Sequence, residues 1–283
     1  MSATTTTATF ETGSRVRETV SDWWVLTKRN LMAYVRKPDL LVFSTIQPVM
    51  FVLLFRYVWG GAMQAILPAN VPYVDFLMPG IFVQTAIFGA LQTGVGLAED
   101  LQKGLIDRFR SLPMARSAVL AGRTAADAVV IVFQVILMLL VAVLVGYRLH
   151  EGLAPALLGF VGACAVGYAF TWVAAFAGLS LKTVEAVQAA MFTLVFPFVF
   201  ASTAFLPDTQ FPGWLQAWSH VNPVSIWSAT IRVLTLGHLY TEAPKGFFGS
   251  VPSLGTLIWQ STAWFFGILA VFSYLGVRVY RRT

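Results

Sequence analysis

Long runs of apolar residues, separated by short polar segments, dominate the sequence and predict membrane-spanning helices. A helix needs about 20 mostly apolar residues to cross the hydrocarbon core of a bilayer. Six runs reach about this length, at residues 40–59, 73–98, 124–146, 153–179, 186–205 and 256–277. The pattern therefore predicts an all-α polytopic membrane protein with six transmembrane helices.

An amphipathic segment precedes the first run. Its aromatic residues share one helical face and its basic residues lie mostly on the other: Trp23, Trp24 and Tyr34 against Lys28 and Arg29. This arrangement is typical of a helix that lies in the membrane interface. The predicted units are a disordered threonine-rich tail (1–18), an interfacial amphipathic helix (19–37) and a six-span domain (38–283).

The longest charged segment between two apolar runs covers residues 99–116. Its large apolar residues recur at i, i+4, i+8 and i+11, namely Leu101, Leu105, Phe109 and Leu112. This spacing predicts one face of a helix, which Pro113 would end. Such a helix could press its apolar face into a groove on a soluble partner. It could equally be a solvated basic helix in a loop, and the pattern alone favours neither reading.

Residues 206–253 differ from the six runs because they are rich in proline and tryptophan. The residues concerned are Pro207, Pro212, Pro223, Pro244 and Pro252, with Trp214, Trp218 and Trp227. Moderately apolar segments broken in this way predict short interfacial or re-entrant helices rather than a full span.

Composition excludes a soluble enzyme. The chain is 57% hydrophobic and 11% charged, whereas soluble domains are about 45–50% apolar and about 25% charged. The net charge of +6 does not indicate nucleic-acid binding, because 15 of the 19 Lys and Arg residues fall on one side of the predicted topology. The other four are Arg56, Arg148, Arg232 and Lys245. This bias predicts that both termini and residues 99–116 lie in the cytoplasm.

Candidate chemistry is sparse. No stretch matches the G-x-x-x-x-G-K-[ST] loop that cradles nucleotide phosphates, so we expect no ATP site on this chain. His150, His220 and His238 fall in predicted outer loops without metal-ligand spacing, and we expect them to be solvated. The acid nearest to His238 is Glu242. We expect Cys164, in an apolar run, to be a small buried residue, and no metal site is predicted.

Ionisable residues are absent from the central parts of the six runs, which disfavours a carrier driven by protons or sodium. Asp75 is predicted to be interfacial. Asp127 is expected at a helix N-terminus, where a carboxylate meets the positive end of the dipole; a buried functional acid is the alternative. Four polar residues of the second run are expected to face the bundle, as structural hydrogen-bonding groups, or a pathway: Gln84, Thr85, Gln92 and Thr93.

Three stretches, in this order and spacing, carry a resemblance to a known family. They are GLIDRFRSLPMAR at 104–116, FLP at 205–207 followed by FPGWL at 211–215, and NPVS at 222–225 continuing to Arg232 and Gly237. With them, the sequence resembles the permease subunits of type 2 ABC exporters, most closely those of the daunorubicin-resistance type. The family often has an acid three residues before the Arg of the third stretch, where this chain has Ala229. An ion pair for Arg232 is therefore in doubt.

The resemblance implies an arrangement of subunits. The loop between spans two and three would dock on a separate ATP-binding subunit, which holds ATP and magnesium. Two permeases and two ATP-binding subunits would form the exporter. The coupling residues implied are Glu99, Asp100, Leu101, Lys103, Gly104, Leu105, Arg108, Phe109, Arg110, Leu112 and Pro113. The residues implied for outward re-entrant helices are Pro207, Pro212, Trp214, Asn222, Pro223 and Arg232.

The expected function is export of drug-like or hydrophobic molecules across a bacterial plasma membrane, with no bond chemistry on this chain. An exporter of a lipid or lipid-linked glycan is the closest alternative. A membrane-embedded enzyme is the alternative of another class, and Asp208, His220 and Asn222 are the nearest approach to the polar cluster that it would need. A structural or sensor membrane protein is a third reading.

Overall fold

The computed structural model describes residues 24–25, 27–32, 34, 36, 38–105, 116–249 and 251–282 of the chain. In chain order the elements are α2 (Pro38–Leu53), the π-helix η1 (Leu54–Val58), α3 (Gly60–Gln64), α4 (Tyr73–Gln102), α6 (Arg116–Leu144), α7 (Leu153–Leu181), α8 (Val184–Phe200), the 3-10 helix η2 (Asp208–Gln210), α9 (Gly213–Val221), α10 (Pro223–Leu236), α11 (His238–Thr241), α12 (Lys245–Phe248) and α13 (Leu254–Arg282). The described residues between 24 and 36 are also helical, and the tail 1–18 lies outside the described residues. Within the described ranges no strand occurs, which confirms the all-α prediction.

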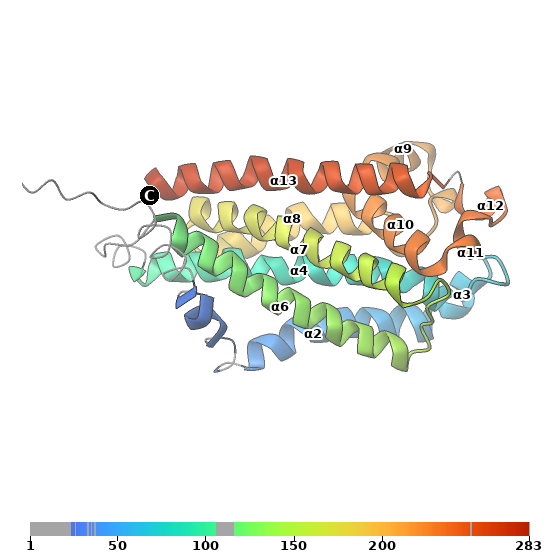
Figure 1. Cartoon of the computed structure of the whole chain (residues 1–283), viewed down its shortest axis with the longest axis horizontal. Helices are drawn as coiled ribbons and strands as arrows, with labels where there is room; N and C mark the ends of the chain where they lie inside the picture. The colour runs from blue at the N-terminus through green and yellow to red at the C-terminus, as the bar shows by residue number, and fades with distance from the viewer. Residues whose placement is uncertain are drawn as a thin grey trace, which may run out of the picture.

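The long helices lie side by side along the molecule (Figure 1). Four helical stretches are long and apolar enough to cross a membrane: Tyr73–Gln102, Leu120–Leu144, Leu153–Leu181 and Leu254–Tyr280. They correspond to the second, third, fourth and sixth predicted spans. The first predicted span is α2 continued by η1, and the fifth is α8, with 17 residues. These two are shorter apolar helices that complete the polytopic bundle.

Helix α4 is the core of the bundle. It packs against α2, α6, α7, α8 and α10. In its most apolar 18-residue stretch 94% of the residues are buried, whereas in the corresponding stretch of α13 only 11% are. The approach to α7 is closest where Gly94 faces Gly178, because a Cβ atom on Gly178 would collide with the Gly94 carbonyl oxygen. Small residues allow helix backbones to approach closely in membranes. The glycines of the second apolar run therefore set how tightly α4 and α7 pack.

Gly178→Ala is expected to destabilise the bundle by about 1–3 kcal/mol, because the added methyl group must push two backbones apart. The matched control is Gly162→Ala on the same helix, where an added Cβ meets nothing within 4 Å. The control should be neutral, or stabilising by up to about 1 kcal/mol, since glycine inside a helix is unfavourable relative to alanine. Thermal unfolding midpoints in detergent measure both effects, and equal midpoints would contradict close α4–α7 packing.

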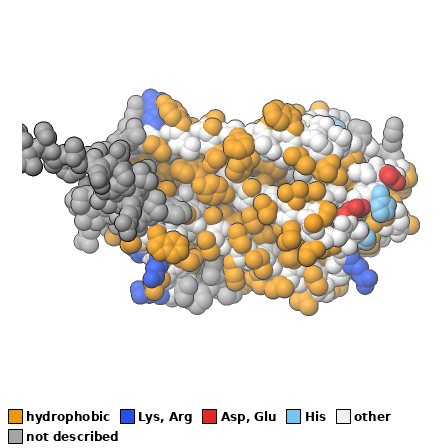
Figure 2. All heavy atoms as spheres, viewed as in Figure 1, with side chains coloured by type: hydrophobic (Ala, Val, Ile, Leu, Met, Phe, Trp, Pro, Cys, Tyr) orange, Lys and Arg blue, Asp and Glu red, His pale blue; other side chains and the backbone are white. Residues whose placement is uncertain are grey.

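The two ends of the bundle differ. Figure 2 shows hydrophobic side chains over the middle of one face, and acidic and histidine side chains gathered at the end that carries α11 and α12. We call this the short-helix end, because η2, α9, α11 and α12 are all short and α10 has only 14 residues. The prediction that the proline-rich region forms short helices instead of a full span is confirmed.

Local sequence explains how α10 begins and ends. The Asn222 side chain accepts a hydrogen bond from the Val224 amide at 2.9 Å and caps the helix, and Pro223 occupies the first helical turn, where its missing N–H costs nothing. The same Asn222 donates to the Phe198 and Ala201 carbonyls. Gly237, with φ of 54°, stops the helix. These contacts anchor α10 to the end of α8.

Candidate functional site

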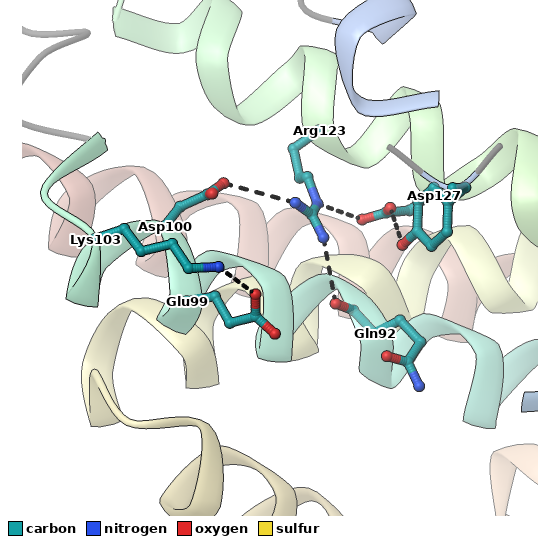
Figure 3. Close-up of polar contacts among 7 residues, drawn as sticks. Gln92, Glu99, Asp100, Lys103, Arg123 and Asp127 are labelled. Atoms are coloured by element: carbon teal, nitrogen blue, oxygen red, sulfur yellow. Dashed lines mark hydrogen bonds and ion pairs between the residues drawn. The ribbon is translucent and has the colours of Figure 1, made fainter. Parts of the chain in front are cut away.

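A buried ionic network lies at the end of the bundle opposite the short helices, where α4 ends and α6 begins. Arg123 of α6 is its centre (Figure 3). Its Nε lies 3.2 Å from Asp127 Oδ2 and its Nη1 lies 3.6 Å from Asp100 Oδ2. The Tyr34 hydroxyl, from the N-terminal helical segment, donates to Asp127 Oδ1 at 2.9 Å. The network therefore joins the N-terminal helical segment, α4 and α6. We call the end of the bundle that contains it the network end.

The network is complete as well as buried. The Asp127 side chain is 2% exposed and that of Arg123 is 14% exposed. Burial, followed by the charge on Asp127, raises the pKa of the Tyr34 hydroxyl, so this group stays protonated and donates. Arg29 is close enough to Asp100 to add a second favourable electrostatic interaction. Two acids thus meet two cations, the balance that a buried ion pair needs in order not to destabilise the fold.

The position of Asp127 corrects the prediction that it lies at a helix N-terminus. Helix α6 begins at Arg116, so Asp127 lies about three turns inside it. Asp127 is buried, as the alternative of a buried functional acid requires. The predicted run began only at residue 124, because the charged residues Arg116 and Arg123 interrupt the apolar pattern over the first two turns of the helix.

The predicted helix of residues 99–112 is interrupted. Helix α4 continues through Glu99 and Asp100 and ends at Gln102, followed by Lys103 and by Gly104 with φ of 65°. The prediction of one helical face through Leu101 and Leu105 is therefore wrong, because the helix ends between these two residues.

The residues that were predicted to couple to an ATP-binding subunit, and that precede this break, differ in their surroundings. Lys103 pairs with Glu99 at 2.8 Å on the surface, whereas Leu101 packs against a buried cluster that contains Leu97, Leu120 and Tyr280. Leu105 is partly exposed. Arg108, Phe109, Arg110, Leu112 and Pro113 lie outside the described residues. The ionic network and the Lys103–Glu99 pair thus lie where α4 leads into the loop, and the loop ends where α6 begins.

A cleft of about 700 Å³ opens beside the network. Its walls come from the N-terminal helical segment (Arg29, Tyr34), α4 (Gln92, Glu99), α6 and α8. A second cavity, of about 310 Å³, shares Gln92, Val95 and Gln188 with the cleft and is also lined by Gln47, Phe88 and Phe192. The two spaces together form a groove along α4 and α8. Gln92 lines this groove, whereas Gln84, Thr85 and Thr93 are buried in the bundle.

The sequence that forms this architecture matches a known protein family. The family model of the ABC-2 type transporters matches residues 21–236. The chain belongs to this family.

Among its relatives, the daunorubicin resistance ABC transporter permease protein DrrB1 of Streptomyces coeruleorubidus is 31% identical over 94% of this chain and 87% of the relative. The probable doxorubicin resistance ABC transporter permease protein DrrC of Mycobacterium tuberculosis is 27% identical over 83% and 81%. The putative transport permease ycf38 of Cyanophora paradoxa is 28% identical over 76% and 74%. The chain is therefore a multi-pass membrane permease of a family that works with an ATP-binding subunit.

At the short-helix end of this permease, Arg232 pins three elements together. It is fully buried in α10. Its Nε donates to the Phe76 carbonyl at 2.8 Å, and its Nη2 donates to the Thr203 and Ala204 carbonyls at 2.6 and 2.8 Å. The guanidinium carbon also lies 3.7 Å from the centroid of the Phe76 ring. The guanidinium of Arg232 thus has carbonyl oxygens and an aromatic face as partners.

The remaining re-entrant residues are structural or exposed. Pro207 and Pro212 precede η2 and α9, and Asn222 and Pro223 start α10. Trp214 is largely exposed. Of the three residues considered for a membrane-embedded enzyme, Asp208 and His220 lie 3.7 Å apart, whereas the Asn222 side chain bonds to the backbone at the end of α8 and the start of α10. Among the described residues, no group of three or more His, Cys, Asp or Glu could hold a metal ion.

At the same end, two residues have partners that the sequence did not indicate. Asp75, in the first turn of α4, has a side chain that is only 1% exposed, and its Oδ2 lies 2.8 Å from His150 Nε2. The His238 side chain is 64% exposed, as expected of a solvated residue, and its ring lies 3.1 Å from Glu151, which is not its nearest acid in the sequence. The partners are distant in sequence, and no local pattern signals them.

Proposed function

We propose that this permease is the membrane subunit of an ATP-driven exporter of drug-like, amphipathic molecules. Two copies, or this chain and a relative, would pair with two ATP-binding subunits, which hold ATP and its magnesium; the permease itself makes and breaks no covalent bond. The names of DrrB1 and DrrC support the class of cargo. The observation that carries the proposal is the buried network that flanks the loop between α4 and α6.

The network end would face the cytoplasm of a bacterial cell, and the short-helix end would face outward. The distribution of Lys and Arg along the sequence supports this orientation, because 15 of 19 fall in segments assigned to the network end and to the two termini. The loop between α4 and α6 would then be within reach of a cytoplasmic ATP-binding subunit.

Coupling would begin at this loop. When the ATP-binding subunits close, they would displace the segment containing Arg108, Phe109 and Arg110. The displacement would reach α4 through Asp100, α6 through Arg123, and the N-terminal helical segment through Tyr34. Packed, fully paired networks change by switching between discrete arrangements and do not deform smoothly. A movement of the loop would therefore shift whole helices and widen or close the groove along α4 and α8.

The groove offers a route for cargo. Its wide mouth carries charged residues, whereas its deeper part presents glutamine amides and aromatic rings, with Phe88 and Phe192 packed edge to face at 5.7 Å. Binding sites for drug-sized ligands are mostly apolar with a few placed polar groups. An amphipathic molecule with a planar aromatic part would suit these walls better than a polar sugar chain would.

The direct test is co-purification with the ATP-binding subunit encoded beside this chain, followed by a screen for substrates that stimulate ATP hydrolysis. Stimulation by anthracycline-like compounds is the expected result. Stimulation by lipid-linked glycans alone would favour the alternative cargo. Turnover of a substrate by the purified permease without any ATP-binding subunit would overturn the proposal in favour of an enzyme.

Leu105→Asp and Arg108→Glu should each uncouple ATP hydrolysis from export. Export in proteoliposomes should fall by roughly 5-fold or more, the usual size of coupling between sites, while membrane insertion is retained. Gln102→Ala is the control, because Gln102 is an exposed residue at the last turn of α4. Unchanged export in both loop variants would remove the loop from this role.

A further inference from the structure

All three histidines of the chain lie against a carboxylate at the short-helix end. His150 Nε2 is 2.8 Å from Asp75 Oδ2, His238 Nδ1 is 3.1 Å from Glu151 Oε1, and His220 Nε2 is 3.7 Å from Asp208 Oδ2. Histidine is the side chain that ordinarily changes charge near neutral pH, at about 6.5. This repeated pairing, which the proposed transport function does not use, points to a response to protons.

Two of these pairs belong to one short segment, residues 146–152, which joins α6 to α7 and which we call the latch. His150 of the latch contacts Asp75 in the first turn of α4, and Glu151 contacts His238 at the start of α11. The latch therefore bridges the central helix and the buried helix α10 that leads into α11. The third pair, His220 with Asp208, is longer and lies outside the latch.

Backbone hydrogen bonds hold the latch at the same points. The Arg148 amide donates to Asp75 Oδ1 at 3.0 Å, and the His150 amide donates to the Thr235 carbonyl of α10 at 2.9 Å. The His238 amide donates to Glu151 Oε1 at 3.4 Å. Asp75 thus receives both a backbone and a side-chain contact from the latch, so that its attachment depends on the state of the His150 ring.

Protonation would turn both side-chain contacts into ion pairs and add a Coulombic attraction to each. The Asp75 side chain is 1% exposed, so water screens its contact little, whereas His238 and Glu151 are 64% and 36% exposed and their pair is screened more. The other ionisable residues of the latch are Tyr147 and Arg148. Burial raises the pKa of the Tyr147 hydroxyl, which stays neutral, and arginine stays charged. Thr235 of α10 has no ionisable group.

We propose that residues 146–152 form a proton-sensitive latch, which protonation of His150 and His238 tightens onto α4 and the α10–α11 corner. A tightened latch holds the short-helix end closed. Its consequence for transport rests on the proposed function, in which that end faces outward: acidification outside the cell would slow the opening through which cargo leaves. The latch itself requires only the contacts described above.

Hydrogen exchange of the full-length permease with its ATP-binding subunit, in lipid nanodiscs at pH 5.5 and pH 7.5, tests the latch. Protection factors, which correct for the intrinsic pH dependence of exchange, should be roughly fivefold higher at pH 5.5 for the Arg148 and His150 amides, as an added ion pair of about 1 kcal/mol implies. His150→Gln with His238→Gln should abolish this difference, because glutamine can hydrogen-bond but does not titrate. His220→Gln should leave it intact. A wild-type protein without the difference, or a double variant that retains it, would overturn the proposal.

Substrate-stimulated ATP hydrolysis in the same samples separates the latch from the transport function. The wild-type rate, relative to that of the double variant, should be lower at pH 5.5 than at pH 7.5. Equal ratios at both pH values would overturn the effect of the latch on opening. Stimulation that is absent at both pH values in every sample would instead overturn the exporter function, while the exchange measurement would still decide whether the latch exists.

Discussion

Arg123→Met is expected to abolish substrate-stimulated ATP hydrolysis and export, and to lower the free energy of unfolding by about 3–5 kcal/mol. Arg123 stands between the buried carboxylates of Asp127 and Asp100, at 3.2 and 3.6 Å. Its removal leaves two acids without their shared cation in a site that solvent barely reaches. Thermal unfolding in detergent and ATPase assays of the complex with the ATP-binding subunit measure the two effects.

Two controls separate stability from coupling. Lys103→Met breaks only the exposed pair with Glu99, so its cost should be below about 1 kcal/mol. The triple variant Arg123→Met, Asp100→Asn, Asp127→Asn removes all three charges and should regain much of the lost stability, because no buried charge remains unpaired. If the triple variant also regains substrate-stimulated hydrolysis, the network only supports the fold, and its place in coupling is contradicted.

The long spans could be predicted from the sequence because their apolar runs are local signals. The run at 73–98 corresponds to α4 (Tyr73–Gln102), and the run at 153–179 corresponds to α7 (Leu153–Leu181). The lipid-facing surface needs apolar residues wherever a helix crosses, so composition alone marks the element. Helix ends were less certain because charged residues inside the ends of α4 and α6 lower the local hydropathy without ending the helix.

The network could not be predicted because its contacts are not local. Tyr34 and Asp127 are 93 residues apart, and neither has an unusual neighbour in the sequence. The same holds for Asp75 and His150, which are 75 residues apart. Hydrophobic periodicity reports which face of an element is buried, but it does not report which buried polar groups meet. The i, i+4 pair of Arg123 and Asp127 was the one local signal available.

The break after Gln102 had a signal in the sequence that the apolar spacing obscured. Leu101 and Leu105 fit a helical face, yet Gly104 lies between them, and glycine commonly ends helices by adopting a positive φ. Here its φ is 65°. Leu101, the apolar residue before the break, belongs to the packing of the bundle, because it contacts the cluster that contains Leu97 and Leu120. Spacing alone cannot separate a residue that packs inward from one offered to a partner.

Arg232→Met is expected to destabilise the short-helix end by at least about 3 kcal/mol, because it leaves the three carbonyls of Phe76, Thr203 and Ala204 without their donor, at about 1–3 kcal/mol for each buried group. Arg232→Lys should rescue this only in part, since an ammonium group cannot reproduce the fork of donors that reaches two elements at once. Arg148→Met is the matched control, because the contact of Arg148 with Asp75 is made by its backbone amide.

Hydrogen exchange of the α10 amides and thermal unfolding measure the result of these variants. Faster exchange through α10 in Arg232→Met, with little change in Arg148→Met, is the expected outcome. The same pattern should extend to the first turn of α4, because Phe76 belongs to that turn and its ring lies 3.7 Å from the guanidinium carbon. A variant that keeps wild-type exchange in both helices would show that the short-helix end is held by apolar packing alone, and that the buried guanidinium does not pin it.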